Sequence, residues 1–213
     1  MPPLVVEWGR VRDSLPKEVK NWLLDKRLYS KQYYTGIAEL YSLFVRLAFM
    51  LKDPTTKEKQ LHEFLLSYPS ILDPYGSCIM SEVRLENKYR IDLVIQYKLE
   101  EKQLLLIELE RASLSIFTKK GRLRASVIHA VQQVEDWIRW WRENPNSIPR
   151  AFDGSIPPQG LVVIGRAMNL DDESKRRLNH LNYNRLVKII TYDELLDRIE
   201  NLANSLEALQ KPK

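Results

Sequence analysis

The stretch Ile91-Asp-Leu-Val-Ile95 and the stretch Leu104-Leu-Leu-Ile-Glu-Leu-Glu110 decide the fold of this chain. Both are rich in the branched and large apolar residues that favour β-strands, and the polar run Glu100-Glu101-Lys102 between them is typical of a turn. The sequence therefore predicts two adjacent antiparallel strands joined as a hairpin.

Hydrophobic matching predicts the register of this hairpin. If Leu93 lies opposite Ile107, each neighbouring apolar residue also meets an apolar partner, and Asp92 lies opposite Glu108. Side chains alternate between the two faces of a strand, so Glu110 projects on the same face as Glu108. The pattern thus places three carboxylates together on one face of a buried hairpin.

Three neighbouring carboxylates repel one another and raise each other's pKa unless a positive charge lies between them. Oxygen ligands without Cys or His suit a hard cation such as Mg²⁺ or Mn²⁺ better than zinc. A metal held in this way is commonly used in phosphoryl transfer. The alternative is that Asp92, Glu108 and Glu110 only mark strand ends that face water.

Composition limits the classes of function. The 213 residues contain 33 Lys and Arg against 28 Asp and Glu, a net charge of +5 that permits a nucleic-acid partner without requiring one. A single cysteine, Cys78, excludes an internal disulfide framework and a Cys-rich zinc site. No stretch has the length and hydrophobicity of a membrane span or a signal peptide, so we expect no membrane association and a cytoplasmic location.

The rest of the chain predicts a mixed sheet covered by helices. Helical patterns cover residues 1–52, which we interpret as an N-terminal helical segment, and Thr55-Thr-Lys-Glu58 predicts a new helix start. Strand-like and helical patterns then alternate through residues 53–213, which indicates a single α/β domain. The run Trp137-Ile-Arg-Trp-Trp141 fits core packing, with one aromatic side chain left near the surface, better than a platform for base stacking.

The order of these elements resembles the core of the PD-(D/E)XK nuclease superfamily, the restriction-endonuclease-like fold. More closely, residues 58–200 are similar to the nuclease domain of the Shedu antiphage defence proteins. The matching segments are Leu61-His-Glu-Phe-Leu-Leu-Ser-Tyr-Pro69, Ile91-Asp-Leu, Ile107-Glu-Leu-Glu-Arg111, Ala130-Val-Gln-Gln-Val-Glu-Asp-Trp137, Gly160-Leu-Val-Val-Ile-Gly-Arg166 and Ile190-Thr-Tyr-Asp-Glu-Leu-Leu196.

The resemblance implies a Mg²⁺-dependent endodeoxyribonuclease that forms homo-oligomers and acts on DNA in antiphage defence. It implies that Asp92 and Glu108 bind the metal, that Glu63 completes the ligand set, and that Gln133 orients the site or the scissile phosphate. Glu63 could equally be a solvated glutamate, and Gln133 a hydrogen-bonded core amide.

Glu110 departs from the family pattern, which usually has Lys at this position. A glutamate there adds a metal ligand but removes the cation that orients the attacking water. The alternative function is therefore an inactive nucleic-acid-binding or oligomerisation module with a nuclease fold. After this acid, the loop with Lys119, Lys120, Arg122 and Arg124 is predicted to contact DNA phosphates, unless it is a solvated turn.

Overall fold

The structure is a computed structural model that describes residues 36–74, 76–97, 104–147, 157–183 and 185–210. The chain divides into two compact units. One contains residues up to Phe49 together with those from Leu196 onward, and the other is Met50–Leu195. Each unit is described separately below.

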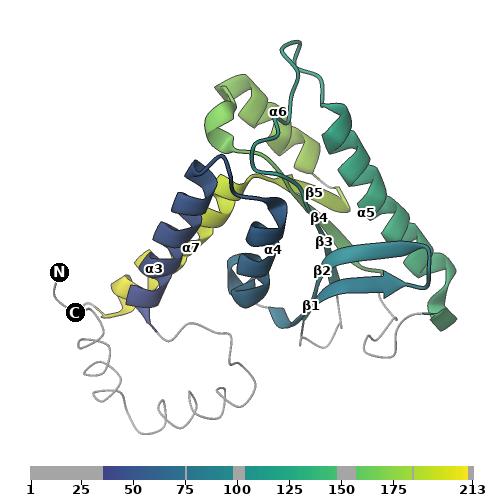
Figure 1. Ribbon diagram of the computed structural model, residues 1–213, viewed down its shortest axis with the longest axis horizontal. Coiled ribbons are helices and arrows are strands. Elements are labelled where there is room, and N and C mark those ends of the chain that lie inside the picture. Colours follow the sequence, from purple (N-terminus) through teal and green to yellow (C-terminus); the bar gives the residue numbers. More distant parts are fainter. Residues whose placement is uncertain (1–35, 75, 98–103, 148–156, 184, 211–213) are drawn as a thin grey trace, which may run out of the picture. The chain divides into compact units, whose positions relative to one another are not determined.

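The unit Met50–Leu195 is built on one five-stranded mixed sheet (Figure 1). Its strands are β1 (Gly76–Leu85), β2 (Tyr89–Tyr97), β3 (Leu104–Leu109), β4 (Gln159–Val163) and β5 (Val187–Ile190), in the spatial order β1-β2-β3-β4-β5. Strand β2 is antiparallel to both β1 and β3, whereas β3, β4 and β5 are parallel to one another. The predicted mixed sheet is confirmed.

Helices cover both faces of this sheet, as the α/β prediction requires. They are α4 (Glu58–Ser67), α5 (Ala125–Glu143) and α6 (Asp172–Asn182), with short 3₁₀ turns at Pro69–Ile71, Pro145–Ser147 and Ala167–Asn169. Figure 1 shows α4 and α5 on opposite sides of the sheet. The α5 side buries a core of Val94, Leu106 and Val162 from the strands against the apolar stripe of the helix.

The tryptophans of α5 belong to this core. Trp137 is 0% exposed, Trp140 5% and Trp141 1%, so core packing is confirmed, whereas the expectation that one aromatic side chain lies near the surface is wrong.

The other unit contains most of α3 (Ile37–Lys52) and of α7 (Tyr192–Gln210). Leu40, Leu43 and Leu47 are the buried residues of α3. The Tyr41 hydroxyl donates a hydrogen bond of 2.9 Å to the Glu207 carboxylate, which links α3 to α7 within the unit. The predicted division at residues 52 and 53 stays a prediction, and residues 1–35 of the N-terminal helical segment lie outside the described residues.

Candidate metal and nucleic-acid site

The hairpin register is the one that hydrophobic matching predicts. Leu93 pairs with Ile107 and Ile95 with Leu105. The same register, continued by one residue, places Asp92 opposite Glu108. The backbone N–H of Leu109 donates a hydrogen bond of 2.9 Å to Oδ2 of Asp92, which fixes this carboxylate against the end of β3.

Glu108 is the most unusual of the predicted site residues. Its side chain is buried, with 8% exposure, and its Oε2 atom has no hydrogen-bond partner within the described part of the chain. Burial raises the pKa of Glu108 to about 9, and the nearby charges of Asp92 and Glu110 add to this effect. A buried carboxyl group with an unpaired oxygen destabilises a fold, so its presence needs a functional explanation.

Glu110 follows β3 directly and is half-buried. Its backbone is held on both sides, because its N–H donates to the Val163 carbonyl at 2.9 Å and its carbonyl accepts from the Tyr192 hydroxyl at 2.8 Å. Burial raises the pKa of the Glu110 carboxyl, as does the charge of Glu58, whereas His129 opposes the shift. The three predicted acids therefore influence one another electrostatically, as the hairpin pattern indicated.

The structure places Glu58, and not Glu63, with these acids. Glu63 is exposed and lies 3.9 Å from the Lys59 ammonium, while Glu58 lines the cavity that contains Asp92 and Glu108. Helix α4 begins at Glu58 after the N-cap Lys57, whose N–H is capped by the Gln60 side chain at 2.7 Å. The helix start predicted at Thr55 is therefore wrong, because Thr55 instead forms a turn with Asp53.

A cavity of about 650 Å³ is lined by Asp92 and Glu108, whereas Glu110 is not among its lining residues. Gln133 lines it from α5, so the structure brings this predicted residue to the acids. Sequence reasoning missed several other lining side chains. The β1–β2 hairpin contributes Lys88 and Arg90, and α4 contributes Glu58. Helix α5 contributes His129, Gln132 and Asp136. For the α5 residues the available signal was helical spacing, since His129, Gln132, Gln133 and Asp136 share one face.

The donor chemistry of the site fits a hard divalent cation. Carboxylate oxygens, as in Asp92, Glu108 and Glu110, are the ligand type that Mg²⁺ and Mn²⁺ prefer. The Oε2 atom of Glu108 has no hydrogen-bond partner among the described residues, so it is available as a metal ligand. Among the described residues, no three Asp, Glu, His or Cys side chains stand close enough together to form a finished metal cluster. Binding would therefore require rotation of these side chains toward a common point.

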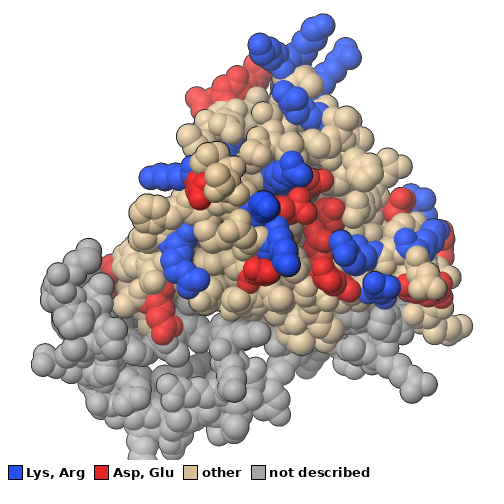
Figure 2. Space-filling view, viewed as in Figure 1, with Lys and Arg blue, Asp and Glu red and all other residues tan. Residues whose placement is uncertain are grey.

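The predicted phosphate-binding loop lies between β3 and α5. Lys119, Lys120, Arg122 and Arg124 are all exposed, and Arg124 is the N-cap of α5. Figure 2 shows Lys and Arg gathered at the tip of this loop, and acidic side chains among basic ones lower on the same face. Arg124 precedes His129 by five residues, a rise of about 7.5 Å along a helix, so the basic loop ends close to the acidic cavity.

Comparison with known families shows to which family the chain belongs. The sequence profile of the family described as "Shedu protein SduA, C-terminal" matches residues 55–196. The chain belongs to this family. The match covers all five strands and α4, α5 and α6, so the resemblance to the Shedu family predicted from sequence is confirmed. No curated protein sequence matches the chain.

Solved structures similar to this Shedu-family chain include three endonuclease or DNA-complex structures. A repair endonuclease from Pyrococcus abyssi is 14% identical, with a TM-score of 0.39, over 66% of this chain and 48% of that one. The structure titled EndoMS-dsDNA2 complex is 15% identical, with a TM-score of 0.36, over 63% of this chain and 44% of that one. The restriction endonuclease FokI bound to DNA is 14% identical, with a TM-score of 0.42, over 92% of this chain and 33% of that one. The Shedu-family chain spans less than half the length of each. None of its described helices is long and apolar enough to cross a membrane.

Proposed function

We propose that this Shedu-family protein is a metal-dependent DNA nuclease that hydrolyses phosphodiester bonds. The observation that carries the proposal is the buried carboxyl of Glu108, which lines a cavity of about 650 Å³ with Asp92 and whose Oε2 atom has no hydrogen-bond partner among the described residues. Such an arrangement destabilises the metal-free fold and becomes favourable when a cation neutralises it. Membership of the Shedu family and the nuclease titles of similar structures agree with this chemistry.

Each residue has a separate role in the proposal. Asp92, Glu108 and Glu110 hold the metal, and Glu58 takes the supporting position first assigned to Glu63. A bound Mg²⁺ or Mn²⁺ would lower the pKa of a coordinated water and stabilise the charge that develops on the phosphate. Gln133 can donate its amide N–H groups to a phosphate oxygen from the opposite wall of the cavity.

Lys88 and Arg90 supply positive charge to the same cavity. They would attract a phosphodiester to the site and return positive charge to a place where Glu110 stands instead of the usual Lys. Arg90 lies 3.7 Å from Glu82 in an exposed pair, which is weak enough for the guanidinium to exchange this partner for a phosphate.

The second candidate function is an inactive nucleic-acid-binding module. It is favoured by Glu110 in the Lys position and by side chains that, within the described residues, do not form a finished metal cluster. The antiphage role, the homo-oligomeric state and the cytoplasmic location are proposals that rest on the family resemblance and composition.

Glu110→Gln distinguishes the two candidates. If Glu110 is a ligand, the substitution removes one negative charge from the site, and we expect half-maximal cleavage to need roughly ten times more Mg²⁺, with activity partly restored at saturation. Cleavage of a labelled duplex is measured across Mg²⁺ and Mn²⁺ concentrations. If the wild type and Glu110→Gln are equally inactive at every metal concentration, the protein is instead the inactive binding module.

Two matched variants of α4 test the supporting ligand. Glu58→Gln and Glu63→Gln remove the same charge from the same helix, but only Glu58 lines the cavity. We expect a higher metal requirement for Glu58→Gln and an unchanged one for Glu63→Gln. The reverse result would restore the ligand role to Glu63.

The basic loop is tested by replacing Lys119, Lys120, Arg122 and Arg124 together with Ala. Each lost phosphate contact reduces counterion release, so we expect weaker DNA binding and a slope of log K against log salt that is shallower by about 0.9 for each contact. Binding is measured without divalent metal at several salt concentrations. An unchanged slope would show that the loop is a solvated turn.

A further inference from the structure

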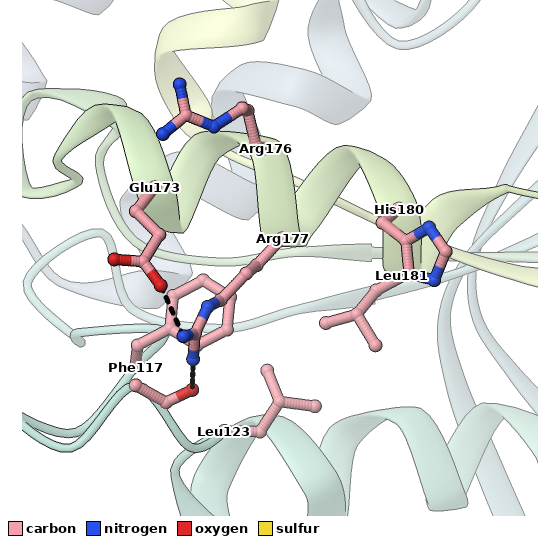
Figure 3. Close-up of a pocket in the computed structure, with 8 residues that line it drawn as sticks. Phe117, Leu123, Glu173, Arg176, Arg177, His180 and Leu181 are labelled. Carbon is pink, nitrogen blue, oxygen red and sulfur yellow. Dashed lines mark hydrogen bonds and ion pairs between the residues drawn. The ribbon is translucent and has the colours of Figure 1, made fainter.

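A second hollow of about 520 Å³ lies between the basic loop and α6, apart from the acidic cavity. Its apolar lining consists of Phe117 and Leu123 from the loop and Leu181 at the end of α6, and Figure 3 shows these side chains around one space. This volume is within the roughly 300 to 1,000 Å³ of small-ligand sites. None of the functions proposed above uses this hollow.

The walls of the hollow are held together by specific contacts. Phe117 and Leu123 form an isolated β-bridge, which closes the loop into a small hairpin. Arg177 of α6 donates a hydrogen bond of 2.8 Å to the Gly121 carbonyl and is also paired with Glu173 (Figure 3). Gly121 has φ of 71°, in the left-handed region of backbone conformation that favours glycine.

The surroundings of the hollow are positively charged. Arg176 and His180 line it, and the exposed cations Lys119, Lys120 and Arg122 lie on the same loop as Phe117 and Leu123. Glu173 is the one acidic side chain among the described lining residues, and it is already paired with Arg177. An apolar pocket with an aromatic side chain and a cationic border matches a nucleotide, whose base has an apolar face and whose phosphate is anionic.

We propose that this hollow binds one unstacked base of a DNA strand, whose backbone phosphates contact the basic loop. The inference rests on the proposed function, since it takes the bound molecule to be the nuclease substrate. The loop leads directly into α5, whose following turns carry His129 and Gln133 at the acidic cavity, so one strand can reach both sites. A base in the hollow would select DNA that has an unpaired nucleotide near the cleaved bond.

Leu181→Trp tests the proposal, because the larger indole occupies part of the hollow and narrows the space for a base without changing the charge. The full chain is used in EDTA, so that no cleavage occurs. Binding is measured for two duplexes that differ only in one unpaired adenosine. The control is Met168→Trp, which adds the same side chain at a position that is 75% exposed and does not line the hollow.

The wild type should prefer the duplex with the unpaired base by roughly five- to a hundredfold, the effect of stacking one base. Leu181→Trp should lose this preference and keep the affinity for the paired duplex, while Met168→Trp should behave as wild type. A 5-iodouracil at the unpaired position should crosslink to the peptide that contains Phe117 or Leu181.

Three results would overturn the proposal. The first is an unchanged preference in Leu181→Trp. The second is a 5-iodouracil crosslink that forms in neither the Phe117 nor the Leu181 peptide, which would place the unpaired base outside the hollow. The third is a change in sedimentation of DNA-free Leu181→Trp, which would make it a contact between copies of the chain. A wild type that binds neither duplex would instead refute the proposed function itself.

Discussion

Asp92→Asn is expected to reduce divalent-dependent DNA cleavage by at least about a hundredfold while leaving the protein folded. The amide oxygen of Asn can still accept the hydrogen bond from the Leu109 N–H, so the hairpin keeps its geometry. The negative charge that would bind the cation is lost. Rates are compared on the same labelled duplex at saturating Mg²⁺.

The control for this variant is Asp172→Asn. Asp172 is a largely exposed residue of α6 that does not line the acidic cavity, so its replacement should leave the rate unchanged. Melting temperatures of both variants exclude unfolding as the cause of lost activity. Full cleavage by Asp92→Asn would end the assignment of the metal site to this hairpin.

Glu108→Gln is expected to stabilise the metal-free protein, and increasingly so as pH rises. Burial raises the pKa of Glu108 from 4.5 to about 9, so the folded state keeps a proton that the unfolded state releases within this range. The stability of the wild type therefore falls as pH rises from about 4.5 to 9, whereas neutral Gln contributes no such change. One pKa unit corresponds to about 1.4 kcal/mol, so the accumulated difference at pH 7 is roughly 3 kcal/mol.

This gain is measured by urea unfolding in EDTA between pH 5 and pH 8. At about 2 to 4 °C for each kcal/mol, the melting temperature of Glu108→Gln should exceed that of the wild type by roughly 6 to 12 °C at pH 7. Glu63→Gln is the control, since Glu63 is exposed and its loss should change neither value. If Glu108→Gln were less stable than the wild type at pH 8, other groups of the protein would be stabilising the ionised Glu108 carboxylate.

The hairpin was predictable because its register depends on residues close in sequence. Matching apolar residues across Leu93 and Ile107 leaves one solution, and a slip by one residue would move the apolar set to the wrong face. The acids alternate with the core residues of the same strands, so the register also determines their common face. Gln133 follows from the periodicity of α5 once that helix is known to cover this face.

The supporting residues were not predictable in the same way. Whether Glu58 or Glu63 approaches the acids depends on where α4 begins and how it is rotated on the sheet. The Lys57 cap determines its start, and the Thr55 signal pointed three residues too early. Lys88 and Arg90 reach the cavity from a hairpin whose position depends on the sheet as a whole. The hollow beneath the basic loop needs Arg177 and Gly121, which are 56 residues apart in the sequence.

The buried Glu108 also has an evolutionary consequence. Neighbouring positions of β3 are filled by apolar residues that stabilise the sheet, so random substitution of Glu108 by a neutral residue would improve folding and damage only activity. Selection for stability alone would therefore remove this residue quickly. If the proposed function is right, we therefore expect Glu108 to be kept in relatives whose site is active. Lineages freed from selection for activity would lose Glu108 early and keep the sheet, which is how inactive descendants of such a nuclease would arise.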